Sequence, residues 1–331
     1  MRPQQTLVRR AYSAWLSFWF PAPAPGAQLA LLRIGTALIL LYVLFVRSFD
    51  LEAQFAQAIW ANPATQAALD PVGWPFSVFL WVDGSWWLWS MHVLAMVLAT
   101  ALLAGVLTPL MAALSLVFQL SYAHYNPTML LGVDGLLTVA LAYLALVPSG
   151  RVLGVLARVE PEAPRYPPYL AYLEDDLPRR KEATLPWSAL AVRVLQIHLS
   201  LIYLHSGLSQ LTTDWLAGTP LWHPRLVALG VPFTLATLQS VPYLTSLFTF
   251  GLVLFELFYA VLIWVRPLRY PLLALALLVH LGVGLAWGLL PFNLLMIVLN
   301  LAFVPAEHLH AAVRFIRPLL VLPWVVTEPR E

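Results

Sequence analysis

The sequence predicts an all-α fold, a polytopic membrane helix bundle of about eight transmembrane helices with both termini in the cytoplasm. Composition is the first reason: 61% of the 331 residues are hydrophobic and 10% are charged, whereas a soluble domain carries about 25% charged residues. The second is a series of apolar runs of about membrane-spanning length. The third is the distribution of basic residues along the chain.

Eight apolar runs are separated by polar or turn-forming segments. We expect membrane spans at 29–46, 86–104, 109–122, 133–147, 187–209, 242–265, 271–288 and 291–304. The last run is short for the roughly 20 residues that a straight span needs. The expected domains are an N-terminal interfacial segment at 1–26, a transmembrane domain at 27–306 with a cytoplasmic loop at about 149–186, and a cytoplasmic C-terminal tail at 307–331.

The basic residues decide the orientation of this bundle. Fourteen of the eighteen Lys and Arg residues lie in the N-terminal segment, the 149–186 loop, the turn between the sixth and seventh spans, and the C-terminal tail. Arg47 and Arg225 fall on the opposite side, and Arg33 and Arg193 lie within spans. Because Lys and Arg concentrate in cytoplasmic segments of membrane proteins, the sequence predicts that both termini and the loop are cytoplasmic.

Several chemistries are absent from the chain. It has no cysteine, which excludes disulfides, thiolate catalysis and Cys-ligated metal sites. No Gly-rich phosphate loop or HExxH motif is present, so we expect no metal site. The expected partners are membrane lipids and not nucleic acid. Seventeen of the eighteen basic residues are Arg, which is typical of a GC-rich genome, and we expect the inner (plasma) membrane of a bacterium.

The fifth span carries a polar stripe along one side. At 100° per residue the following residues share that side: Arg193, Gln196, Ser200, Tyr203, Ser206, Gly207 and Gln210. Such a stripe is costly against lipid, so it should face other helices or a cavity. We expect the function of the protein to depend on this stripe.

Two charges inside spans need an explanation. Arg193 lies ~9 Å from the inner end of the fifth span and Glu256 ~13 Å from the inner end of the sixth. An unpaired carboxylate at such depth is costly, so we predict a structural ion pair between Arg193 and Glu256. Snorkelling to the headgroups is the other interpretation of Arg193 and of Arg33.

Three further residues are candidates for a site, each with a plainer interpretation. His280, near the middle of the seventh span, is either a satisfied core residue or a functional imidazole. Asp134 starts the fourth span and is either a first-turn acid favoured by the helix dipole or a site residue. Trp215 is either an interfacial aromatic residue or a ligand contact. His280 and Asp134 are the two catalytic candidates.

Four segments resemble a known membrane family. They are HYNPTMLLGVDGLLTVALAYLALVPSG (124–150), QIHLSLIYLHSGLSQLTTDWLAG (196–218), FELFYAVLIW (255–264) and HLGVGLAWGLLPFNLLMIVLNLAF (280–303). Their order and spacing resemble the HTTM family, the horizontally transferred transmembrane domain that includes the vitamin K-dependent gamma-carboxylases. The resemblance covers roughly residues 25–310. It implies a helical membrane fold with a pocket open to the outer leaflet, and a quinone or vitamin K-like lipid as ligand.

The chain departs from the carboxylases where their chemistry resides. The lysine that serves the carboxylases as a base stands within the element resembling SGLSQL, and that position is Gln210 here. A glutamine is neutral and cannot act as a general base near pH 7. Asp134 stands where the carboxylases carry a histidine, whereas His280 matches a histidine of the family. No counterpart of their large soluble domain follows the membrane part.

Two functions remain open at this point. The first is a non-catalytic member of the family that binds a lipid or quinone, transports it, or serves as a scaffold for a separate partner protein or enzyme. The second is a membrane-embedded enzyme acting on a lipid or quinone. In both, we expect an outer-leaflet pocket with polar groups at its mouth and one imidazole at its floor. Its ligand-binding candidates are Gln210, Tyr203, Ser206, Trp215, His280 and Asp134.

Overall fold

A computed structural model gives the arrangement of the helices. It describes residues 15–19, 26–55, 76–126, 129–151, 153–154, 186–218, 242–309 and 311. Most of the expected N-terminal segment, cytoplasmic loop and C-terminal tail lies outside these residues. The described part of the chain is helical, with short connecting turns.

A helix lies at each of the eight expected spans. These helices are α2 Gly26–Ser48, α5 Ser85–Ala104, α6 Thr108–Tyr125, α7 Gly132–Ala145, α8 Pro186–Ser209, α12 Pro242–Leu262, α13 Arg269–Trp287 and α14 Leu290–Asn300. Shorter elements join them: α3 Leu51–Phe55, η1 Val78–Leu80, η3 Ser149–Arg151, α9 Thr213–Leu216, η6 Arg266–Leu268 and η7 Leu301–Phe303. The all-α prediction is therefore confirmed.

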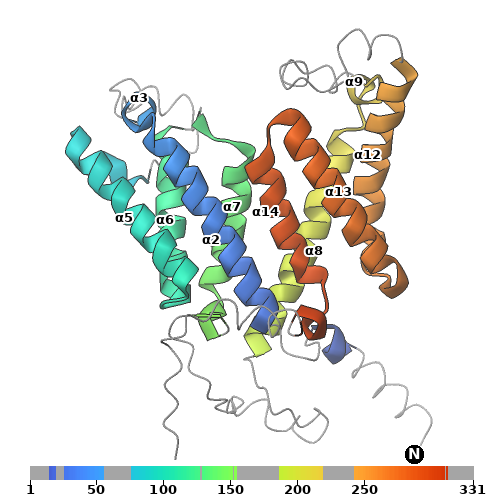
Figure 1. Cartoon of the computed structure of the whole chain (residues 1–331), viewed down its shortest axis with the longest axis horizontal. Helices are drawn as coiled ribbons and strands as arrows, with labels where there is room; N and C mark the ends of the chain where they lie inside the picture. The colour runs from blue at the N-terminus through green and yellow to red at the C-terminus, as the bar shows by residue number, and fades with distance from the viewer. Residues whose placement is uncertain are drawn as a thin grey trace, which may run out of the picture.

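The eight long helices run alternately up and down and form two groups (Figure 1). The first group is α2, α5, α6 and α7, in which α2 packs on α5 and α6 packs on α7. The second contains the pairs α8 with α12 and α13 with α14. Helix α14 joins the groups, because it contacts α2 and α7 as well as α13 and α8.

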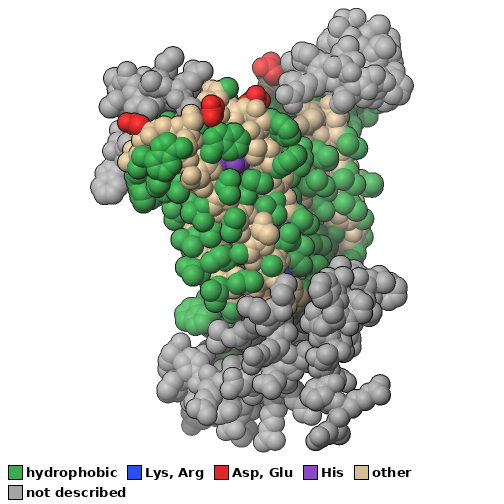
Figure 2. All heavy atoms as spheres, turned by 60° about the vertical axis from the view of Figure 1, so that its left-hand side comes forward, with side chains coloured by type: hydrophobic (Ala, Val, Ile, Leu, Met, Phe, Trp, Pro, Cys, Tyr) green, Lys and Arg blue, Asp and Glu red, His purple; other side chains and the backbone are tan. Residues whose placement is uncertain are grey.

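Five of these helices are long and apolar enough to cross a membrane, namely α2, α5, α8, α12 and the helical segment that contains α13. Helices α7 and α14 are apolar but shorter. Figure 2 shows a face covered by hydrophobic side chains between the two ends of the molecule, with acidic side chains gathered at one end. The chain is thus an integral membrane protein, whereas the count of eight crossings and their orientation stay predictions. We call the end where α2 stops and α7 starts the predicted outer end.

Arg33 is buried by protein at the opposite, predicted inner end. Its side chain is fully buried and donates hydrogen bonds to the carbonyl oxygens of Leu102, Leu103 and Leu153, at 3.0, 2.8 and 2.8 Å. Two of these carbonyls belong to the last turn of α5, where intrahelical partners are missing. Gly105 ends that helix in the left-handed region at φ 81°. Arg33 therefore closes the end of a helix and does not snorkel to the headgroups.

Helices α8 and α12 approach each other closely at Gly207. A Cβ atom there would lie 2.9 Å from the Leu257 side chain and 3.2 Å from Cβ of Glu256. Lower down, the Trp264 indole donates a 3.0 Å hydrogen bond to Ser200 Oγ. These two contacts fix the antiparallel register, with residue 207 opposite 256–257 and residue 200 opposite 264.

Candidate functional site

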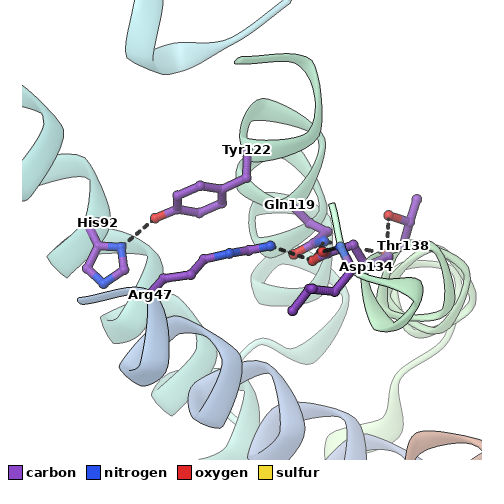
Figure 3. Close-up of polar contacts among 7 residues, drawn as sticks. Arg47, His92, Gln119, Tyr122, Asp134 and Thr138 are labelled. Atoms are coloured by element: carbon purple, nitrogen blue, oxygen red, sulfur yellow. Dashed lines mark hydrogen bonds and ion pairs between the residues drawn. The ribbon is translucent and has the colours of Figure 1, made fainter. Parts of the chain in front are cut away.

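Polar side chains from four helices meet at the predicted outer end of the first group (Figure 3). Arg47, in the last turn of α2, extends toward Asp134, in the first turn of α7. The guanidinium Nη2 lies 2.7 Å from the carboxylate Oδ1, and both side chains are buried. The Arg47 guanidinium also lies over the ring of Tyr122, 4.9 Å from its centroid.

The Asp134 carboxylate is fully engaged. Besides Arg47, it accepts hydrogen bonds from Gln119 Nε2 at 2.7 Å and from the backbone N–H of Leu131 at 2.8 Å. The Leu131 N–H is one of the donors that a helix N-terminus leaves without an intrahelical partner. This contact supports the interpretation of Asp134 as a first-turn acid. The buried Arg47 guanidinium stabilises the same carboxylate.

His92 forms a second part of the same cluster. Ser48 Oγ donates to the carbonyl of Leu44, so the 2.8 Å contact with His92 Nε2 is a hydrogen bond donated by the imidazole. Nδ1 is then the acceptor, and it receives the Tyr122 hydroxyl at 2.6 Å. His92 and Tyr122 are both buried. The cluster therefore ties α2, α5 and α6 together without a ligand.

The sequence analysis did not predict this outer cluster, although the positions of two of its residues indicate it. Arg47 is one of the two basic residues on the side where few are expected, and Asp134 starts a helix at the same end. Two opposite charges at the same depth favour a pair. The sequence alone could not show that α2 and α7 are neighbours.

A second network runs through the core of α8, α12, α13 and α14. Tyr259 donates to Asn300 Oδ1 at 2.6 Å, and Asn300 Nδ2 donates to the Tyr203 hydroxyl at 2.7 Å. Tyr203 and His280 Nε2 are 2.6 Å apart, and His280 Nδ1 lies 2.8 Å from Asn293 Oδ1. Each of these side chains is buried.

The partners of His280 define its tautomer. Asn293 uses its amide nitrogen to donate to the carbonyl of Leu289, so its oxygen accepts from Nδ1–H of His280. Nε2 is then an acceptor, and it takes the hydroxyl hydrogen of Tyr203. Both ring nitrogens are occupied by protein. His280 is thus a satisfied core residue in this structure, and it can act on a ligand only by exchanging one of these partners.

The Gln210 group lies about two turns above Tyr203 along α8; we use this name for Ser206, Gln210 and Glu256. Gln210 Nε2 donates to Ser206 Oγ at 3.0 Å. Both side chains lie beside the carboxyl group of Glu256 on α12. Glu256 Oε2 and Gln210 Oε1 are buried atoms with no hydrogen-bond partner among the described residues. These two atoms are the unsatisfied part of the site.

The predicted ion pair between Arg193 and Glu256 is not formed in the structure. Arg193 donates to the carbonyl of Phe18 at 2.6 Å and to Gln196 Oε1 at 2.7 Å, and its guanidinium lies near the ring of Trp264. The depth argument assumed that α8 and α12 end at the same level. In the observed register Glu256 is opposite residue 207, fourteen residues and about 20 Å from Arg193 along α8.

The structure brings only some of the predicted site residues together. Tyr203 contacts His280, and Ser206 contacts Gln210. Asp134 is directed instead toward α2 and α6 and shares no hydrogen bond with either set. Asp134 therefore belongs to the outer cluster in this structure, and its place in the ligand pocket stays a prediction.

Trp215 lies on α9 and makes a T-shaped contact with Trp287, with ring centroids 6.4 Å apart. Because α9 packs against α12, this aromatic pair is at the same end as Gln210. A small cavity lies elsewhere, between α2, α7, α8 and α14, and its lining is mostly aliphatic. Within the described residues, no group of three His, Asp or Glu residues could hold a metal ion.

Comparison with known families bears on the second network. Residues 174–307 match the family model of the HTTM domain, which confirms the resemblance over this part of the chain. This part of the chain is similar to the HTTM domain. The Tyr203–His280 network and the Gln210 group lie inside the matched HTTM residues, whereas Arg47 and Asp134 lie before them. No curated protein and no solved structure matches the chain.

Proposed function

We propose that the HTTM domain binds an amphiphilic lipid or quinone at its predicted outer end, beside the Gln210 group, and does not perform gamma-carboxylation. The observation that carries the proposal is the pair of buried acceptor atoms on Gln210 and Glu256 that lack partners. Buried polar atoms in proteins are normally hydrogen-bonded. An unsatisfied pair in the outer half of a membrane domain is therefore a binding-site signal.

The surroundings of these atoms suit an amphiphile. Ser206, Gln210 and Glu256 are only partly buried, so their side chains border the surface, and a headgroup would reach the two buried acceptor atoms by displacing the groups that cover them. Leu208 and Leu211, which flank Gln210 in the sequence, are exposed and apolar. A polar head would be held by the Gln210 group while its hydrocarbon chain lies along the lipid-facing surface.

Gln210 is the reason to expect no carboxylation. In the resemblance to the carboxylases this position holds the base, and a neutral amide has no proton affinity of the required size. We expect no carboxylated product from the protein supplied with vitamin K hydroquinone and a glutamate peptide. Gln210→Lys alone should not create the activity, since Asp134 also stands where the carboxylases carry a histidine. Product formed by the unaltered protein would refute the proposal.

Extraction of the purified protein tests the binding itself. Mass spectrometry of the organic extract should find a lipid or quinone in near-stoichiometric amount in the wild type and several-fold less in Gln210→Leu. Gln54→Leu, the same substitution on α3 in the other group, is the matched control and should retain the ligand. Equal ligand in all three proteins would contradict binding at Gln210.

One observation favours the enzyme alternative. Glu256 places a titratable carboxyl group beside Gln210, and a partly buried carboxyl group is a candidate general acid or base. In that case the extracted molecule should be chemically converted by the wild type. Glu256→Gln should then bind the molecule and fail to convert it, whereas a pure binder converts nothing in either form.

A further inference from the structure

When Glu256 is ionised, the two unsatisfied atoms of the Gln210 group are both acceptors. Glu256 Oε2 belongs to a carboxyl group that has Ser206 and Gln210 as its polar neighbours. Gln210 Oε1 is the carbonyl oxygen of an amide whose nitrogen is already bonded to Ser206. A ligand that satisfies this pair must supply hydrogen-bond donors. A fully oxidised quinone carries only acceptor oxygens and cannot do so.

The charge of the Glu256 carboxyl group further limits which kind of hydrogen-bond donor a ligand can offer. The one ion pair within 4 Å among the described residues is Arg47 with Asp134, so no Lys or Arg side chain of those residues neutralises Glu256. Arg193 is about 20 Å away along α8 by the observed register. A carboxyl group in this position is either protonated or matched by a cation from outside the protein. A cationic donor satisfies both its hydrogen bonding and its charge.

We propose that Glu256 and Gln210 bind the primary ammonium group of an amine-bearing phospholipid headgroup. The proposal rests on the proposed function and names the chemistry of its ligand. An ammonium group offers three N–H donors from one atom, so one can reach Glu256 Oε2 while another reaches Gln210 Oε1. The negatively charged phosphate stays outside the group, and the acyl chains remain in the outer leaflet.

Close helix packing positions the two acceptors. The Gly207 contact brings α8 within reach of Cβ of Glu256, and Ser206 and Gln210 are neighbours of Gly207 on the same helix side. Ser206 lies between the two acceptor-bearing side chains, because it accepts from Gln210 and is a neighbour of Glu256. The geometry thus holds an amide oxygen and a carboxylate oxygen together at one position on the α8–α12 seam.

Native mass spectrometry of the full chain in detergent can test the headgroup. The probes are phosphatidylethanolamine, phosphatidylcholine and diacylglycerol with identical acyl chains, together with an oxidised quinone. We expect wild-type protein to bind phosphatidylethanolamine about tenfold more tightly than phosphatidylcholine, whose quaternary ammonium has no N–H donor. Diacylglycerol, a neutral hydroxyl donor, should bind no better than phosphatidylcholine.

Substitutions test whether the preference for phosphatidylethanolamine depends on Glu256. Glu256→Gln keeps the shape of the side chain and removes its charge, and it should reduce the preference to about twofold or less. Gln54→Leu should leave it unchanged. Because the comparison among lipids is made within the wild type, a variant that fails to fold does not remove the test.

The possible results distinguish failure of the ammonium assignment from failure of the proposed function. Equal binding of the ethanolamine and choline lipids, or equally tight binding of diacylglycerol, would overturn the ammonium assignment. Quinone binding that is lost in Gln210→Leu would also overturn it while leaving the proposed function intact. If none of the four probes binds in a way that depends on Gln210, both proposals fail.

Discussion

At the scale of single residues, the buried pair of Arg47 and Asp134 makes the sharpest prediction. Asp134→Ala leaves a buried guanidinium without its counter-ion, which should destabilise the protein by about 3–5 kcal/mol. The double variant Arg47→Met with Asp134→Leu removes both charges and should recover most of that loss. The measurement is the free energy of unfolding in detergent.

Asp214→Ala is the control for that experiment. Asp214 is exposed on α9, so its removal should change stability by no more than about 0.5 kcal/mol. If Asp134→Ala behaves like this control, or if the double variant is less stable than Asp134→Ala, the pair does not hold the first group together.

A second prediction at this scale concerns Gly105. Its φ of 81° lies in the left-handed region, and a Cβ atom there would approach Arg33 Nη1 to 2.5 Å. Gly105→Ala should therefore destabilise by about 2–4 kcal/mol through backbone strain and displacement of Arg33. Gly251→Ala on α12, where a Cβ meets nothing within 4 Å, should be neutral or stabilising by up to about 1 kcal/mol. Thermal unfolding of the two variants side by side measures the difference.

At the scale of elements, the register of α8 against α12 predicts that Arg193 and Glu256 act independently. In a double-mutant cycle with Arg193→Ala and Glu256→Ala, the two losses of stability should add within about 0.5 kcal/mol. A coupling of several kcal/mol would mean that the helices slide by about four turns relative to this structure. Gln196→Ala is the positive control, because Arg193 donates to its side chain.

The helices themselves were predictable and their relative heights were not. Apolar length and turn residues placed α2, α5 and α13 within a few residues of their observed bounds. The polar stripe of α8 also indicated correctly that Tyr203 and Gln210 face other helices. Which atoms meet depends on how far one helix is shifted along its axis relative to its neighbour. Because hydrophobicity is nearly uniform along a span, the sequence carries little information about this shift.

At the scale of the whole molecule, orientation in the membrane is the prediction still to be tested. The distribution of basic residues predicts that both termini and the 149–186 loop are cytoplasmic. A reporter active only in the cytoplasm and fused after Arg180 should be active, and the same reporter fused after Trp215 should be silent. The reverse pattern would mean that the orientation is opposite to the predicted one, with the Gln210 group in the cytoplasmic leaflet.

The bond between Arg47 and Asp134 has a consequence for how the chain is made. The two residues are 87 positions apart, so the ribosome has released the guanidinium long before it adds the carboxylate. In the predicted orientation, α2 carries an uncompensated positive charge at its outer end during that interval, against the rule that keeps such charges inside. The charge is neutralised only when α7 arrives. We therefore expect the first four long helices to be inserted and folded as one unit, and a chain cut between α6 and α7 should be rejected by the cell's quality control.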